Sequence, residues 1–149
     1  MLPAAEIAEA REHPQRVAAR HSIDPHTLTR LLSGDLDTVM AACVDHTNSP
    51  YTPAGTPCTA SFMLCLGCRC ARALPGHLPV QVAVFDLLVA RRQHLTPLRW
   101  AQRFSLPHAQ LSDLLQRAGS VAVHDARTGL TAAQLRLAER FLDRELDLP

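Results

Sequence analysis

Apolar residues recur at three- and four-residue spacing on both sides of an irregular centre, which is the pattern of amphipathic helices. No stretch shows the alternation of a half-buried strand, so the sequence predicts an all-α fold. The centre is broken by X-Pro steps at Pro50, Pro53 and Pro57, so residues 46–60 are expected to be loop. Residues 61–73 fit either a helix or a knuckle turn, and residues 119–129 are expected to be loop. The expected helices cover residues 3–12, two short segments within 13–35, then 36–44, 78–94, 97–104, 107–118 and 131–147.

Residues 13–35 have the spacing of a helix-turn-helix unit. Asp24 is a good N-cap with Pro25 at the first helical position, and Gly34 is suited to end the second helix. The plain alternative is an αα-hairpin without DNA contact, because any such hairpin needs similar spacing and Ser22 stands where the turn often carries glycine. If the unit reads DNA, its second helix would offer His26, Thr27, Thr29 and Arg30.

Residues 14–32 and residues 97–115 are similar in sequence, with eight identities in nineteen positions at an offset of 83. The second copy fits a buried pattern better than the first. Asp113 would lie on its exposed face and would repel phosphates. The similarity therefore predicts two helical hairpins of similar geometry, without a duplicated function.

All five cysteines of the chain lie in residues 43–77. The predicted helix 36–44 would deliver the first of them at its C-terminal end. At 149 residues the chain fits one compact domain, in which 1–42 forms the N-terminal helices, 43–77 the cysteine-rich segment and 78–149 the C-terminal helices. The prediction is a single-domain helical bundle with an irregular loop stapled by zinc.

The cysteine spacing is typical of a structural zinc site, because a C-x2-C pair and two remoter thiolates can complete a tetrahedron. A closed site of this kind leaves no position for a substrate and contributes to folding instead. Cys70, His46 or His77 could replace one of the ligands, and an iron–sulfur cluster or simply buried thiols are the alternatives. The predicted ligands are Cys43, Cys58, Cys65 and Cys68.

The net charge is only +1, but six arginines against one aspartate give residues 69–103 a local balance of +5. Such a block can be an electrostatic footprint for nucleic acid, although a solvated face is the plainer interpretation. The candidate phosphate contacts in and beside the cysteine-rich segment are Arg69, Arg72, Arg91 and Arg92.

The sequence departs from known catalytic and haem-attachment motifs at residues that those motifs require. We therefore predict that the chain is not an enzyme. Ser61 stands where a zinc deaminase has its second cysteine, and Arg69 replaces the histidine of a haem-attachment motif. The N-terminus lacks the apolar region of a signal peptide, and no apolar stretch is long enough to span a membrane. A cytoplasmic protein with reduced thiols is expected, which favours metal over disulfides.

A run of short motifs resembles the cysteine-rich region of actinobacterial, Streptomyces-type proteins associated with tyrosine recombinase or integrase genes of mobile elements. The resemblance covers roughly residues 35–105. It implies a zinc-binding, nucleic-acid-related accessory protein and supports the same four cysteine ligands. The chain lacks a recombinase's catalytic set, since its single tyrosine, Tyr51, lies in the proline loop. The motifs are Ala42-Cys43-Val44-Asp45, Ser49-Pro50, Pro57-Cys58, Ser61-Phe62, Cys65-Leu66-x-Cys68 and His77-Leu78-Pro79.

The expected function is therefore that of a zinc-stabilised, non-catalytic accessory or regulatory protein that binds nucleic acid, most directly DNA. The alternative is a zinc-stabilised protein–protein interaction module, an adaptor or homo-oligomer, without direct nucleic-acid contact.

Overall fold

The computed structural model describes residues 1–148 of the chain. The chain divides into two compact units, Met1–Pro75 and Gly76–Pro149. The division falls at the predicted end of the cysteine-rich segment. The prediction of a single domain stays a prediction, because compactness does not show whether either unit folds alone.

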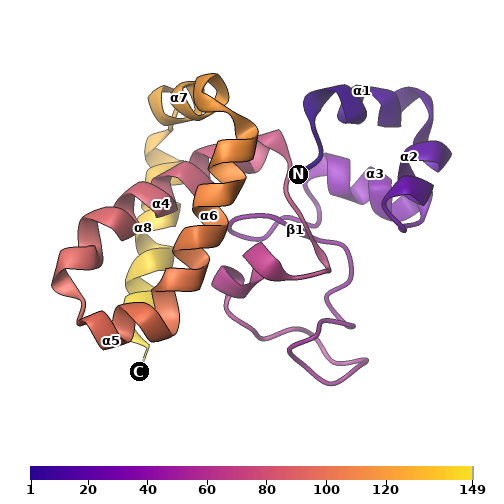
Figure 1. The fold of residues 1–149 in the computed structure, drawn as a ribbon. Coiled ribbons are helices and arrows are strands. Elements are labelled where there is room, and N and C mark those ends of the chain that lie inside the picture. Colours follow the sequence, from indigo (N-terminus) through magenta and orange to yellow (C-terminus); the bar gives the residue numbers. More distant parts are fainter. Residues whose placement is uncertain (149) are drawn as a thin grey trace. The chain divides into compact units, whose positions relative to one another are not determined.

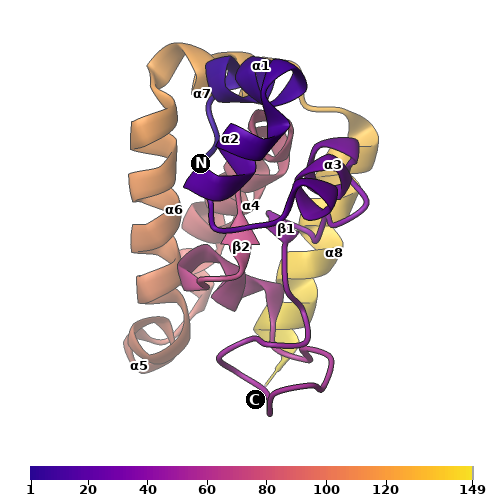
Figure 2. The ribbon, with the colours of Figure 1, turned by 90° about the vertical axis from the view of Figure 1, so that its right-hand side faces the viewer.

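The first unit begins with three short helices, α1 (Ala4–Glu12), α2 (Pro14–Arg20) and α3 (Pro25–Ser33), seen together in Figure 2. The inner faces of these helices share one core with side chains from the cysteine-rich segment. Each fully buried leucine contributes about 1.5–3 kcal/mol relative to an exposed one. The core consists of Leu2, Ala10, Val17, Ala18, Leu28, Leu31 and Ala42, with Ile7, Ile23, Leu32, Leu36, Val44 and Leu74 packed against it.

The connection between α2 and α3 follows the predicted signals. Asp24 caps α3 by accepting the Thr27 backbone N–H at 2.9 Å, and Pro25 occupies the first helical position. Gly34 ends the helix with a φ of 85°, in the left-handed region that glycine enters without steric cost. Ser22 in the turn also has a left-handed φ, 56°. The turn therefore needs the conformation for which glycine is usual, and a serine adopts it here.

The predicted helix 36–44 is wrong, because the chain folds back on itself after Gly34. The Thr38 backbone N–H donates to the Ala41 carbonyl at 2.7 Å, and the Cys43 N–H donates to the Leu36 carbonyl at 2.9 Å. These loop-closing bonds replace the i to i+4 bonds of a helix. They lead into the strand β1 (Ala42–Cys43), which pairs antiparallel with β2 (Ala71–Arg72).

Between the two strands the cysteine-rich segment is mostly irregular, as predicted for residues 46–60. One short 3-10 helix, η1 (Phe62–Gly67), begins at Ser61, whose hydroxyl accepts the Met63 N–H at 3.1 Å. Neither of the two forms expected for residues 61–73 covers the whole stretch, because η1 is followed by a short turn at residues 69–70 and then by β2. The two-residue ladder of β1 and β2 has no counterpart in the sequence pattern.

The second unit is built around α4 (Leu78–Arg91), which follows the 3-10 turn η2 (Pro75–His77). Helix α4 contacts α6 (Ser105–Ala118), α7 (Ser120–Thr128) and α8 (Ala132–Asp147), and Figures 1 and 2 show these helices around it. Val84 and Leu88 are fully buried, and Gln81 and Val82 extend burial to a second face of α4. The broad buried surface fits a central helix covered on several sides.

The helices predicted separately at residues 97–104 and 107–118 form one continuous helical segment. A 3-10 turn, η3 (Arg92–His94), leads to α5 (Pro97–Arg99), whose cap Thr96 accepts the Arg99 N–H at 3.2 Å. A π-helical turn, η4 (Trp100–Phe104), then joins α5 directly to α6. Because Pro107 has no N–H and its ring would clash in a regular helix, the wider turn accommodates it. The prediction that residues 97–115 form a second helical hairpin is therefore wrong, since no turn separates α5 from α6.

The loop predicted at residues 119–129 is also wrong, because α7 occupies it. Gly119, with a φ of 90°, separates α6 from α7. Ala126 is buried against α4 and α6, and Arg127 pairs with Asp86 of α4 at 2.8 Å. Tertiary contacts thus stabilise a helix that the local pattern does not indicate.

The last helix agrees with the sequence. The Thr131 hydroxyl accepts the Gln134 N–H at 3.1 Å, and the Gln134 side chain accepts the Thr131 N–H at 2.9 Å, which is the predicted capping box. The all-α fold is confirmed. Within the part of the chain that the structure describes, no helix has the length and apolar character needed to cross a membrane.

Candidate metal centre and nucleic-acid-binding helix

Backbone hydrogen bonds bring the four predicted ligand cysteines toward one another. The β1–β2 ladder pairs Cys43 with Ala71, and the Val44 N–H donates to the Cys70 carbonyl at 2.9 Å. The Cys58 N–H donates to the His46 carbonyl at 2.8 Å, which ties the proline loop back to the end of β1. Three segments far apart in sequence therefore converge around the C-x2-C turn.

The turn itself has the local geometry expected of a thiolate site. The Cys68 N–H donates to the Cys65 carbonyl at 3.2 Å and closes the C-x2-C turn. The Cys70 N–H donates to the Cys68 sulfur at 3.4 Å, and the Asp45 N–H donates to the Cys43 sulfur. Each of these sulfurs thus accepts an N–H from the residue two positions on, and at Cys43 this bond acts to lower the pKa of the thiol.

The thiols act on one another electrostatically. Burial, followed by the negative charges of Cys68, Cys43 and Cys58, raises the pKa of Cys65 to about 11. The pKa of Cys43 is raised as well, first by burial and then by Cys68 and Cys58, against the Asp45 N–H. Ionisation of the half-buried Cys43 and Cys65 thiols is thus opposed by burial and by the neighbouring cysteines, and a cation among them would stabilise the thiolates.

The type and the number of the cysteine ligands fit a structural zinc ion, but their present positions do not form a ligating arrangement. Four thiolates are a common ligand set for structural zinc. Among residues 1–148, however, no three Cys, His, Asp or Glu side chains stand in ligating arrangement. Ligation would therefore require the four thiols to move inward from the positions in this structure.

The alternates to these cysteines differ in burial and in their contacts. Cys70 is buried, and its sulfur points to the Asn48 carbonyl at 3.8 Å. His46 is exposed, and His77 is buried in the second unit. The charges acting on the Cys43 and Cys65 thiols come from the predicted ligands and Asp45. His77 therefore lies outside the unit that holds the cysteines, whereas Cys70 stays beside the predicted ligands, since its N–H donates to the Cys68 sulfur.

Helix α3 presents three of the four predicted contact residues on one face. His26, Thr29 and Arg30 are exposed, at the i, i+3 and i+4 spacing that places side chains together. Leu28 and Leu31 face the core. Thr27 differs, since it is half-buried and its hydroxyl donates to the Asp24 carboxylate at 2.6 Å, which keeps it in the N-cap.

The two arginines of the cysteine-rich segment differ in how they are held. Arg72 donates to the carbonyls of Arg69 at 2.7 Å, Ala71 at 2.9 Å and His21 at 3.2 Å, and so joins β2 to the end of α2. Arg69 is exposed and makes one long bond, 3.3 Å, to the Asn48 carbonyl. Arg69 is therefore the more accessible of the two for an outside partner.

The arginines of the second unit mostly have intramolecular partners. Arg91 pairs with Asp143, and Arg99 donates to the carbonyls of Leu146 and Leu148 at the end of α8. Arg92 lies over the Trp100 ring, 4.5 Å from its centroid. The charge-rich block in the sequence is thus largely a set of contacts within the fold. No sequence signal indicated the Arg92–Trp100 stack, which depends on the path of η3.

No known protein family, curated protein or solved structure matches this chain. The resemblance to the cysteine-rich recombinase-associated proteins therefore remains an expectation from the quoted motifs.

Proposed function

We propose that the chain is a zinc-stabilised, non-catalytic accessory or regulatory protein that binds DNA through α3. The observation that carries the proposal is the α2–turn–α3 unit, with its inner face in the core and His26, Thr29 and Arg30 exposed on one outer face. A recognition helix needs this division, because one face must anchor it while the other reaches base edges.

Zinc would serve the proposed function by fixing the segment that packs behind this unit. Ala42 and Val44 flank the first cysteine and belong to the same core as Leu28 and Leu31. Arg72, next to the β1–β2 ladder, also bonds to the end of α2. Cys43, Cys58, Cys65 and Cys68 would hold the ion, and the ion would add binding free energy to the folding of this core.

Charge limits the strength of the interaction. Residues 1–75 contain six arginines and seven acidic residues. Asp24 lies at the N-terminal end of α3, and its hydrogen bonds from Thr27 hold its pKa below the ordinary value, so it stays ionised. This end of the helix repels phosphates, and the DNA contacts are assigned to the exposed face and to Arg69.

Fluorescence anisotropy with a labelled mixed-sequence duplex tests the proposal. Binding is expected at low salt and should weaken as salt rises, because phosphate contacts release counterions. Arg30→Ala should weaken binding and reduce the salt slope by about one. Arg140→Ala removes the same charge from an exposed position on α8 and is the matched control. Binding that is absent at low salt, or equally reduced by both variants, would contradict the proposal.

A protein-interaction module is the second candidate, and one surface feature favours it. Tyr51, Phe62 and Leu64 of the cysteine-rich segment are exposed by 43%, 41% and 43%. The Tyr51 hydroxyl donates to the Leu64 carbonyl at 3.3 Å, so at least two of these side chains are neighbours. Exposed apolar groups of this kind suit a protein partner or a second copy of the chain. Light scattering that shows concentration-dependent association, together with absent DNA binding, would favour this candidate.

A further inference from the structure

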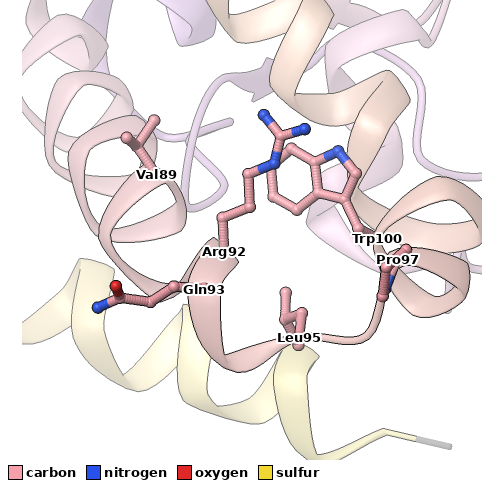
Figure 3. Close-up of a pocket in the computed structure, with 6 residues that line it drawn as sticks. All are labelled: Val89, Arg92, Gln93, Leu95, Pro97 and Trp100. Carbon is pink, nitrogen blue, oxygen red and sulfur yellow. The ribbon is translucent and has the colours of Figure 1, made fainter.

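A pocket of about 660 Å³ lies in the second unit, where the end of α4 turns through η3 toward α5 (Figure 3). This volume is within the range of small-molecule sites, about 300–1,000 Å³. Its wall is mostly apolar, with one charged and one amide side chain. The lining residues are Val89, Arg92, Gln93, Leu95, Pro97 and Trp100.

Arg92 is the one lining residue with a charge, and the way it is held leaves that charge available. Its guanidinium lies over the Trp100 ring at 4.5 Å from the centroid, as Figure 3 shows. Among the described residues 1–148 this guanidinium donates no hydrogen bond and joins no ion pair, and only the Arg92 backbone N–H donates, to the Val89 carbonyl. Stacking on an aromatic face fixes a guanidinium plane while its N–H groups remain free to pair with a carboxylate.

Two other arginines of the second unit differ from Arg92, because each is paired with a carboxylate. Arg91 pairs with Asp143, and Arg127 pairs with Asp86 at 2.8 Å. Both of these charges are neutralised within the fold, whereas the Arg92 charge meets only a ring. An acid that binds beside Arg92 therefore displaces no internal carboxylate.

The apolar wall indicates the rest of the ligand. Val89 is 47% exposed although it follows directly on the buried Leu88. Leu95 and Pro97 lie across the pocket from it in Figure 3. A ligand that covers these side chains gains roughly 25 cal/mol for each Å² of apolar surface removed from water. Gln93 can supply one further hydrogen bond.

We propose that this pocket binds a small aromatic carboxylic acid, with its carboxylate on the Arg92 guanidinium and its ring against Leu95 and Pro97. The site is independent of DNA binding and of the cysteine cluster. It provides the chain with a ligand site that neither the motifs nor the charge pattern of the sequence indicated.

The single tryptophan of the chain gives a direct measurement. In a heteronuclear NMR titration of the full chain with cinnamate, the one indole N–H resonance should shift and saturate. Cinnamyl alcohol, which has the same ring without the charge, should bind roughly tenfold more weakly, since hydrogen bonds to charged groups contribute about that much. Arg92→Gln should weaken cinnamate binding by a similar factor and leave binding of the alcohol unchanged.

Arg140→Gln is the control for loss of a charge, and it should bind cinnamate as the native chain does. A titration without saturation would overturn the proposal. Equal affinities for cinnamate and cinnamyl alcohol in the native chain would also overturn it, and this comparison does not depend on any variant folding.

Discussion

Ser22 adopts an unusual backbone conformation in the turn between α2 and α3. Its φ of 56° lies in the left-handed region, which costs about 1–2 kcal/mol for a residue with a Cβ atom. The residue stands between α2 and α3, where Ile23 must reach the core and Asp24 must cap the next helix. The turn holds its form because both neighbours are fixed by packing and capping.

Replacing Ser22 with glycine should therefore stabilise the chain. The strain is relieved, and the greater freedom of glycine in the unfolded state offsets part of the gain. We expect the free energy of unfolding to rise by about 0.5–1 kcal/mol. Urea unfolding followed at the amide resonances of residues 14–33 measures this change.

Ser33 provides the matched control for Ser22. It is the last residue of α3, and its hydroxyl donates to the Arg30 carbonyl at 2.9 Å. Ser33→Gly should lower the free energy of unfolding by about 0.5–1 kcal/mol, as glycine does in helices. A destabilised Ser22→Gly variant would mean that the turn does not require a left-handed residue.

The helix boundaries that could be predicted from the sequence are those set by capping residues close to the helix end. Asp24 with Pro25 begins α3, Gly34 ends it, and the Thr131 capping box begins α8. Each signal acts through a hydrogen bond or a backbone preference within four residues. Such signals are readable without knowledge of the rest of the fold.

The predictions that are wrong concern segments whose conformation depends on contacts with residues distant in the sequence. The loop at 36–44 closes through the Cys43 to Leu36 bond and then pairs with a strand almost thirty residues on. Helix α7 depends on Ala126 packing against α4 and α6. The four cysteines could be named as a set from their spacing, but their convergence depends on the same ladder. The Arg92–Trp100 pocket depends on the 3-10 turn η3, which no local signal specifies.

Arg72 links two of these elements, and its removal should be costly. It was predicted as a nucleic-acid contact, yet its guanidinium donates to three backbone carbonyls, including that of His21 at the end of α2. Arg72→Ala should lower the free energy of unfolding by about 1–3 kcal/mol, because hydrogen bonds from a charged donor, here to two part-buried carbonyls and one exposed carbonyl, contribute more than those between neutral groups. Urea unfolding measures the change at the amides of α2.

Arg69→Ala is the companion variant. Arg69 is exposed and makes one long bond, so its loss should change stability by less than half as much. Equal effects of the two substitutions would show that Arg72 does not hold β2 to α2.

For the whole molecule, charge is distributed by unit. Residues 1–75 carry six arginines and seven acidic residues, whereas residues 76–149 carry nine and seven. Four thiolates with one zinc ion would add two further negative charges to the first unit. The arginine-rich block seen in the sequence is divided between the units, with two of its six arginines in the first and four in the second. A DNA-binding role relies on α3 and Arg69, and its affinity should be modest and dependent on salt.

The cysteine cluster also gives the first unit a core that extends beyond three short helices. Helices of seven to nine residues, such as α1, α2 and α3, are marginal alone and rely on tertiary packing. Ala42, Val44 and Leu74 supply part of that packing from either side of the cluster. Metal loss is thus expected to loosen α1 to α3 as well as the loop.

Elemental analysis of the untagged protein tests the central claim, that Cys43, Cys58, Cys65 and Cys68 hold a structural zinc ion. We expect about one zinc per chain, retained in Cys70→Ser and lost in Cys65→Ser. Cys70 is the matched control because its sulfur contacts the Asn48 carbonyl. A native chain without bound metal, or full zinc occupancy in Cys65→Ser, would contradict the account.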